Sequence, residues 1–233
     1  ILPEPLHKPA AAAQSFNLLT QLPVDKGTID LKLGSQFRLL LKKPLNKPMS
    51  GIALFGSQTQ AAIPSAGFSV RGQTERFDVA SWMALSNKAE GGAGLQSFDL
   101  TVNRLGLAGQ EFGSTRLLMN PVPGGTSIRA QGMDLDGQVY LPKAKNALIT
   151  ANFKTVHVLP AEKIAATADL PASMAIDFGS PADLPPVSLL IQDLRIVDVD
   201  LGRCEIQTVP SAQGLLIQKF NTQSNLMALT ATG

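Results

Sequence analysis

The sequence predicts a mainly β protein built from repeated hairpins, with one or two short helices. Short apolar runs follow one another along most of the chain, and several alternate with polar residues as half-buried strands do. Ile29, Leu31 and Leu33, for example, fall on one face, while Asp30 and Lys32 fall on the other. The 20 glycines and 16 prolines are scattered at the breaks between runs, where a strand-rich chain needs its turns.

Strands are expected wherever an apolar run lies between two such breaks. In chain order they are predicted at 15–22, 27–33, 35–43, 50–55, 58–63, 67–73, 96–107, 111–119, 126–131, 133–141, 146–158, 173–178, 187–197, 201–208, 213–220 and 224–231. A short helix is expected near 78–86, where Asp78 could cap a first turn that carries Val79 and Trp82 at helical spacing. A second short helix is expected near 160–166.

The organisation of the chain follows from shifts in composition. Residues 1–14 are rich in Pro and Ala and are interpreted as a linker, and the Gly-rich stretch 90–94 marks a boundary. The expected parts are therefore a linker at 1–14, a first β unit at 15–94, a first hairpin repeat at 95–185 and a second, truncated repeat at 186–233. Because the chain begins at Ile1 and stops within an alternating apolar run, we expect it to be an excerpt of a longer protein.

An internal duplication is the most informative feature of the sequence. Residues 98–128 align without a gap with residues 187–217, so that apolar positions, turn glycines and strand-ending prolines recur in register. Leu100 corresponds to Leu189, for example, and Pro121 corresponds to Pro210. Self-similarity of this kind predicts a duplicated structural module, here an antiparallel hairpin with one apolar face.

Both copies of the hairpin change the parity of their apolar positions at the same place. In the first copy Val102 is followed by Leu105, and in the second Ile191 is followed by Leu194. A step of three residues keeps both side chains on one face only where a strand bulges or bends. The first strand of each hairpin is therefore expected to contain a bulge or bend.

Composition argues against several classes of function. The 20 basic residues nearly balance the 18 acidic ones, and there is no basic stripe interleaved with aromatics, so nucleic acid is not an expected partner. Charged residues make up only 16% of the chain, below the roughly 25% of a typical soluble domain. No run approaches the ~18 apolar residues of a membrane-spanning helix. A chain so poor in charge either buries its apolar surface well or exposes some of it for binding.

No set of residues points to catalysis, a metal or a cofactor, and we do not expect an enzyme. His7 and His157 have no cysteine or second histidine at ligand spacing. Cys204 is the single cysteine and is interpreted as a small buried residue. The acidic pairs Asp134/Asp136 and Asp198/Asp200 lie at turns, where Asp is favoured, and lack the further oxygen ligands of a calcium loop. Trp82 is expected to pack its helix onto the edge of the sheet.

Two long segments resemble a known family. The hairpin SFDLTVNRLGLAGQEFGSTRLLM and the segment LPPVSLLIQDLRIVDVDLGRCEIQTVPSAQGLLIQKFNTQSNLMALTATG are similar to the recurring hairpin of the YhdP branch of the AsmA-like proteins. The element GFSVRG, which leads into FDVASW, also resembles a strand-to-helix feature of that branch. The resemblance covers residues 66–233 well and residues 1–65 loosely.

The resemblance implies a fold and a function that the pattern alone does not give. It implies an extended, strongly curved antiparallel sheet whose apolar, taco-like groove crosses the periplasm of a Gram-negative bacterium. It also implies an inner-membrane anchor outside this stretch of chain, with the rest of the same long chain as a partner. Phospholipid acyl chains would move along the groove toward the outer membrane, without covalent chemistry.

In that picture the repeat-matched apolar residues line the groove. The expected lipid-binding residues are Leu100, Val102, Leu105, Leu107, Leu117, Ile128, Leu189, Ile191, Leu194, Ile196, Ile206 and Ile217. The low aromatic content, 5%, suits an aliphatic surface for acyl chains. Two other interpretations stay open from the residues: a closed β-sandwich that serves as a structural or protein-interaction module, and, with one Trp and one Tyr to offer, a carbohydrate-binding domain.

Overall fold

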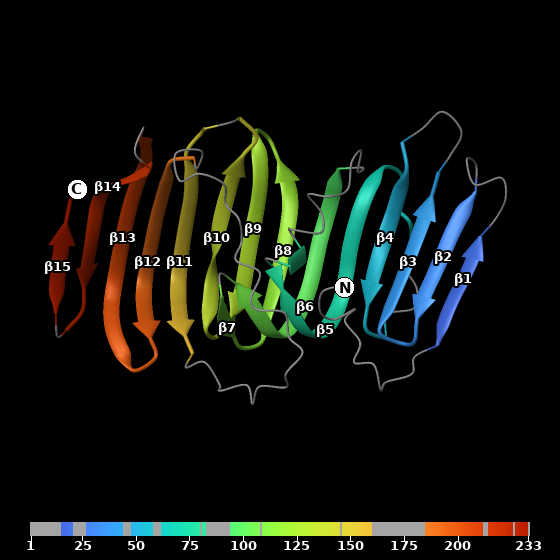
Figure 1. Ribbon diagram of the computed structural model, residues 1–233, viewed down its shortest axis with the longest axis horizontal. Helices are drawn as coiled ribbons and strands as arrows, with labels where there is room; N and C mark the ends of the chain where they lie inside the picture. The colour runs from blue at the N-terminus through green and yellow to red at the C-terminus, as the bar shows by residue number, and fades with distance from the viewer. Residues whose placement is uncertain are drawn as a thin grey trace.

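One sheet contains every described strand. The computed structural model describes residues 15–20, 27–43, 48–57, 62–79, 81–82, 94–107, 109–144, 146–159, 185–211, 214–225 and 227–232. The strands are β1 (Phe16–Thr20), β2 (Thr28–Leu33), β3 (Phe37–Lys42), β4 (Ser50–Phe55), β5 (Gly67–Asp78), β6 (Leu95–Leu107), β7 (Gln110–Phe112), β8 (Thr115–Val122), β9 (Gly125–Gly132), β10 (Leu135–Pro142), β11 (Ile149–Val158), β12 (Val187–Ile196), β13 (Val199–Ser211), β14 (Gly214–Gln223) and β15 (Ala228–Ala231). Figure 1 shows them side by side from β1 at one end to β15 at the other.

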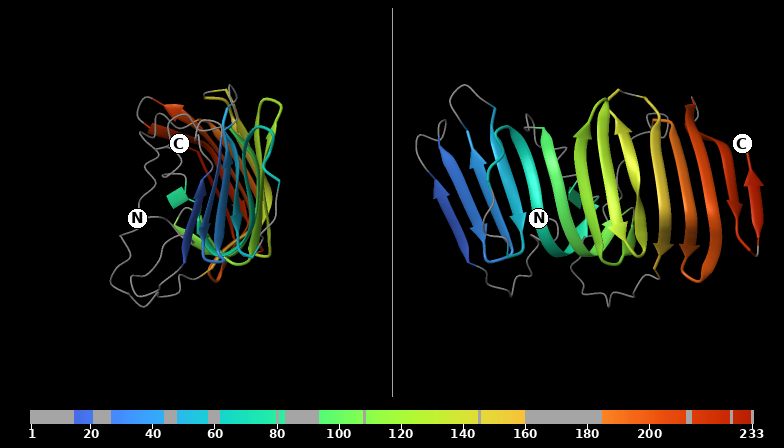
Figure 2. Two further views of the ribbon diagram at one scale, coloured as in Figure 1. Left: turned by 90° about the vertical axis from the view of Figure 1, so that its right-hand side faces the viewer. Right: turned by 180° about the vertical axis from the view of Figure 1, so that it is seen from behind.

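The strand order in space follows the order in the chain. Neighbours are antiparallel except for β4–β5, β5–β6 and β11–β12, which are parallel. Viewed along its long axis, the sheet is a single curved layer (Figure 2). This confirms the predicted mainly β fold and the long, curved, open sheet. Because the described strands form one sheet, they do not build the two facing sheets of a sandwich.

Most predicted strands agree with the observed ones. The predicted strand at 111–119 is divided into β7 and β8 at residues 113–114, and residues 62–63 are not in a strand. The rest of the predicted strand at 58–63, the strand at 173–178 and the helix near 160–166 lie outside the described residues. The predicted boundaries after residues 94 and 185 fall at the parallel neighbours β5–β6 and β11–β12, across which the sheet continues.

The start of the predicted first helix is present after β5. Val79, Ser81 and Trp82 have helical backbone conformation. The Ser81 N–H and hydroxyl both donate to Asp78 Oδ1, at 2.8 Å and 2.6 Å. Asp78 therefore caps this turn in the manner expected of a helix N-cap. The remaining residues of the predicted helix lie outside the described residues.

The duplicated hairpin is also present, with the same register in both copies. Leu100 in β6 pairs with Leu117 in β8, and the equivalent Leu189 in β12 pairs with Ile206 in β13. The register recurs in the following strand pair as well, where Met119–Ile128 of the first copy corresponds to Thr208–Ile217 of the second. The sequence repeat thus corresponds to a structural repeat.

The predicted change of parity has two different structural causes. In the second copy, the β12–β13 register shifts between Ile191 and Leu194, which is an irregularity of the expected kind. In the first copy, β6 keeps a constant register with its parallel neighbour β5 from Gln73 to Asp78. There Thr74 and Phe77 are both buried, and so are Val102 and Leu105, which pair with them. The two strands therefore bend together, and no residue is inserted.

Candidate functional site

One face of the sheet carries an apolar row that crosses every strand from β1 to β15 except β7. We call this the inner face and its continuous row the apolar row. The register places these residues opposite one another in turn: Leu18, Leu31, Leu39, Ala53, Val70, Phe98, Met119, Ile128, Val139, Ala151, Leu189, Ile206, Phe220 and Ala231. No polar residue interrupts it. The row is thus apolar along the whole length of the sheet.

A second row of the inner face runs two residues further along each strand. It contains Phe16, Leu33, Phe37, Phe55, Gly72, Leu100, Leu117, Ala130, Gly137, Phe153, Ile191, Cys204, Thr222 and Leu229. Its single hydroxyl, that of Thr222, donates to the Leu201 carbonyl oxygen at 2.5 Å. The one polar group in this row is therefore satisfied by the backbone, and the row presents an apolar surface.

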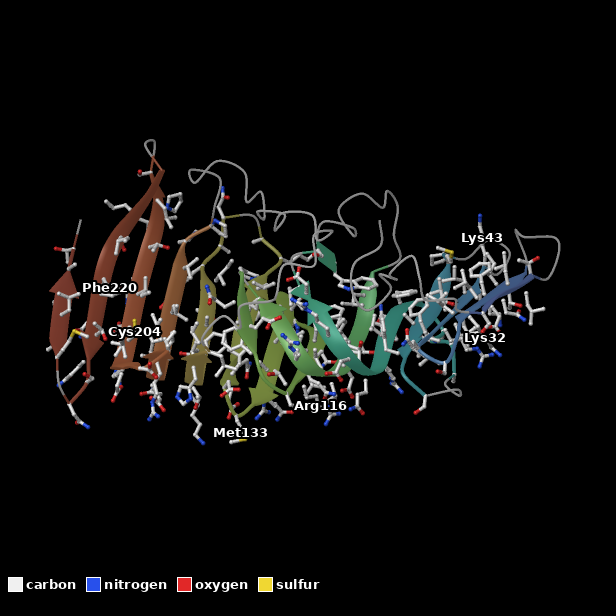
Figure 3. All side chains as sticks on the ribbon, turned by 60° about the horizontal axis from the view of Figure 1, so that its bottom comes forward. Lys32, Lys43, Arg116, Met133, Cys204 and Phe220 are labelled. Carbon is white, nitrogen blue, oxygen red and sulfur yellow. The ribbon has the colours of Figure 1, made fainter. Side chains whose placement is uncertain are left out.

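The opposite, outer face is mostly polar and charged. The row that alternates with the two inner rows consists of Asn17, Lys32, Arg38, Leu54, Arg71, Asp99, Leu118, Arg129, Gln138, Asn152, Leu190, Glu205, Asn221 and Thr230. Figure 3 shows the Lys32 and Arg116 side chains projecting together from this side of the sheet. At β4 this face is covered, because Leu54 and Ile52 are fully buried. Along the other strands the sheet is two-faced, and water suits the mostly polar outer face.

Exposure of the inner face varies strongly along the sheet. At the two ends, Leu18 is 51% exposed and Leu229 is 52% exposed. In the middle, Leu100, Val102 and Leu105 are fully buried and belong to the core cluster that also includes Phe55. The inner face is therefore most accessible at the two ends of the sheet and most covered from β4 to β8. Single inner-face positions further along are also buried, namely Ala130, Ala151, Ile191, Cys204 and Thr222.

An aromatic cluster covers part of this central region. Trp82 stacks on Phe77 with ring centroids 5.5 Å apart and meets Phe55 edge-on at 5.9 Å. Phe37 and Phe98 extend the cluster, at 5.1 Å from Phe55 and 5.8 Å from Phe77. Trp82 thus packs on the sheet, but over the inner face and not at the sheet edge, because the turn capped by Asp78 directs it there.

All the predicted lipid-binding residues lie on the inner face, at different depths. Leu100, Val102, Leu105 and Ile191 are buried, whereas Ile196 and Ile217 are 43% and 44% exposed. The half-buried members are Leu107, Leu117, Ile128, Leu189, Leu194 and Ile206. Only Ile128, Leu189 and Ile206 belong to the apolar row. Which residues align across strands is decided by the register, and the sequence repeat does not give the register.

The residues that the prediction missed come mostly from outside the repeat. Leu18, Leu31 and Leu39 extend the apolar row to the N-terminal end, and Phe220 and Ala231 extend it to the C-terminal end. Alternation within each strand could have identified the same face, as it did for Ile29, Leu31 and Leu33. What alternation lacks is the pairing between strands.

The remaining candidates for chemistry have structural partners. Cys204 is buried in β13, as expected, and this burial raises the pKa of its thiol. His157 Nε2 lies 2.9 Å from Asp193 Oδ2 in the neighbouring strand. Within the described residues, no group of three or more His, Cys, Asp or Glu side chains is arranged to hold a metal ion.

The comparison with protein families decides the identity. The sequence profile of the family described as YhdP protein matches residues 1–233. The chain belongs to the YhdP family. Members of the YhdP family are not known as enzymes, and comparison with curated proteins and with solved structures gives no significant match. In the described part of this YhdP family member, no helix is long and apolar enough to cross a bilayer.

Proposed function

We propose that this chain is a segment of a periplasm-spanning lipid-transfer protein, whose inner face carries phospholipid acyl chains between the inner and outer membranes of a Gram-negative bacterium. The observation that carries the proposal is the apolar row, which continues from Leu18 to Ala231 without a polar residue. Membership of the YhdP family is consistent with such a bridge-like role.

The energetics of such a surface suit movement along it. Each buried methylene contributes about 0.8 kcal/mol, so several tens of contacts with aliphatic side chains would hold an acyl chain firmly. Because neighbouring positions of the row offer similar aliphatic groups, a shift by one strand spacing of about 4.8 Å exchanges one set of contacts for an equivalent set. An acyl chain would thus slide without meeting a position that binds it much more strongly than the neighbouring positions do.

The polar outer face complements this role. Several of its charged residues are paired across neighbouring strands, as in Asp30–Arg38, Asp99–Arg116 and Glu205–Lys219. A single sheet that has water on this face requires apolar material on the other, because a large exposed apolar surface is unfavourable in water. In the proposed function, lipid chains provide that material at the accessible ends.

The single tryptophan offers a direct test of where lipid binds. Trp82 lies on the inner face between Phe55 and Phe77. Phospholipid with brominated acyl chains should quench its fluorescence, whereas the same lipid without bromine should not. Bound lipid that leaves Trp82 unquenched would contradict passage along the central inner face.

Extraction of the purified protein provides the complementary measurement. Organic solvent should release co-purified phospholipid, which mass spectrometry would identify. A protein that carries no lipid, and that takes up none from phospholipid vesicles, would rule the proposal out.

A further inference from the structure

A lysine follows the last inner-face residue of strand β3. Leu39 and Leu41 lie on the inner face, and Lys43 is the next residue of the same parity. The Lys43 N–H donates to the Gly27 carbonyl oxygen at 3.2 Å. The backbone pairing between β2 and β3 therefore continues one residue beyond the end of β3. Figure 3 shows Lys43 on the opposite side of the sheet from Lys32 of the outer face.

Strand β10 ends in the same way. Val139 and Leu141 are followed at the same parity by Lys143, whose N–H donates to the Gly124 carbonyl oxygen at 2.8 Å. Strands β3 and β10 point in the same direction in Figure 1, so Lys43 and Lys143 lie on the same long edge of the sheet. We call this edge the lysine rim.

Both lysines are available to a ligand. Each side chain is exposed, and no ion pair joins either one to a carboxylate of the described part of the chain. By contrast, Lys219 on the outer face is paired with Glu205 at 2.8 Å. A small hollow adjoins the first lysine and is lined by Gly27, Ile29, Leu41, Met49 and Lys43 itself.

The opposite rim has a different character. There acidic side chains bind backbone N–H groups of the turns: Asp134 accepts from Gly113 at 3.3 Å, and Asp200 accepts from Gly202 at 2.9 Å. These carboxylates stabilise turns and would repel an anion. Arginines lie near this rim as well, but they are paired: Arg76 and Arg104 with Glu111, and Arg195 with Asp193. Within the described residues, the two rims thus differ in that Lys43 and Lys143 have no carboxylate partner, whereas these arginines do.

From this asymmetry we infer that the lysine rim binds the phosphate of a glycerophospholipid whose acyl chains lie on the inner face. Lys43 and Lys143 form two stations on one edge, each reached from the apolar row through one more aliphatic residue, Leu41 or Leu141. The inference rests on the proposed function and adds to it the side on which the headgroup travels.

The chemistry of the two stations fits this ligand. An ammonium group is a compact charge on a flexible stem, which can follow a phosphate that moves past. Because both stations are exposed to water, each attraction is weak and would orient the lipid without trapping it. The apolar hollow beside Lys43 would accept the first methylenes of the acyl chains.

The test compares three lipids that have identical acyl chains: phosphatidylglycerol, phosphatidylethanolamine and diacylglycerol, which lacks phosphate. The purified protein is incubated with each lipid in vesicles and repurified, and the bound lipid is counted after extraction. The double variant Lys43→Glu/Lys143→Glu should bind roughly five- to tenfold less of both phospholipids, with diacylglycerol unchanged. The arginine double variant Lys43→Arg/Lys143→Arg should bind all three lipids as the unmodified protein does.

The matched control is the double variant Lys32→Glu/Lys154→Glu, which reverses the charge of two exposed lysines of the outer face. It changes the net charge by the same amount as the lysine-rim variant does. It should leave phospholipid binding unchanged, and an equal loss in both double variants would overturn the inference. Displacement of bound phospholipid by inorganic phosphate would instead indicate a site for the free anion and would also overturn it. If the Lys43→Glu/Lys143→Glu variant binds phospholipid and diacylglycerol in the same ratio as the unmodified protein does, the inference is contradicted and the proposed function is not. Failure of the unmodified protein to bind any of the three contradicts the proposed function itself.

Discussion

Arg38 forms two hydrogen bonds with Asp30 across strands β2 and β3: its Nε donates to Oδ1 at 3.0 Å and its Nη2 donates to Oδ2 at 2.8 Å. The pairing is diagonal, because the residue directly opposite Arg38 is Lys32, two positions beyond Asp30. The same diagonal relationship joins Asp99 to Arg116 in β6–β8. It recurs between Glu205 and Lys219 in β13–β14. Each pair links two strands of a hairpin on the outer face, and so helps to fix their register.

The Asp30–Arg38 pair predicts a specific dependence of stability on pH. The hydrogen bonds from Arg38 lower the pKa of Asp30 in the folded protein. Because the folded pKa lies below the unfolded one, the pair stabilises the fold above about pH 4, and this contribution is lost as the pH falls through the folded pKa. Asp30→Asn should therefore lower the free energy of unfolding by about 0.5 kcal/mol at pH 7 and by less near pH 2.

Urea unfolding at the two pH values measures this effect. In an Arg38→Gln background, Asp30→Asn should have almost no further effect at pH 7, because the partner is already missing. If the loss caused by Asp30→Asn were the same at both pH values, the pair would not be its source.

The buried centre of the inner face should respond to truncation differently from its ends. Leu100 is fully buried, and Leu100→Ala would leave a cavity in the core cluster. We expect a loss of about 3 kcal/mol in the free energy of unfolding. Leu18→Ala, at a position that is 51% exposed on the same face, should cost less than about 1 kcal/mol. Urea unfolding of both variants checks this, and equal losses would contradict the observed gradient of burial.

Gly72 should be irreplaceable for a reason specific to the parallel pair β4–β5. Its φ of 131° is one that other residues rarely adopt, and a Cβ there would collide with the Phe55 carbonyl oxygen. Gly72→Ala should therefore destabilise the protein by at least about 2 kcal/mol. Gly94→Ala, where a Cβ would meet no atom within 4 Å, serves as the control. Thermal unfolding should separate the two variants, and equal midpoints would mean that β4 and β5 are not packed as described.

The fold was largely accessible from the sequence because its strand order follows the chain. Alternation at Ile29, Leu31 and Leu33 was enough to assign their common face, and the repeat gave the hairpin that pairs Leu100 with Leu117. The parallel neighbours were not accessible. Parallel strands are joined by crossover connections, and a local pattern does not tell which strand such a connection reaches.

The candidate site was accessible only in part, because burial depends on what packs over a face. The repeat marks Ile191 and Ile217 as equally apolar inner-face positions, yet Ile191 is 5% exposed and Ile217 is 44% exposed. A charge at Ile191 would be buried and would unfold the protein whether or not lipid binds there. The informative substitution is therefore at Ile217.

Ile217 and Leu216 provide a matched pair for testing the inner face. The two residues are adjacent in β14 and similarly exposed, at 44% and 41%, but they lie on opposite faces, opposite Thr208 and Val209 respectively. Ile217→Asp would place a charge on the surface proposed for acyl chains, whereas Leu216→Asp would place the same charge in water on the outer face. Both variants should lose less than about 1 kcal/mol of stability, because neither carboxylate is buried.

Phospholipid recovered by extraction should fall several-fold in Ile217→Asp and stay unchanged in Leu216→Asp, since desolvating the carboxylate opposes contact with hydrocarbon only on the inner face. Equal recovery from the two variants would show that lipid does not distinguish the faces, and the groove would then have no role in binding at this end of the sheet.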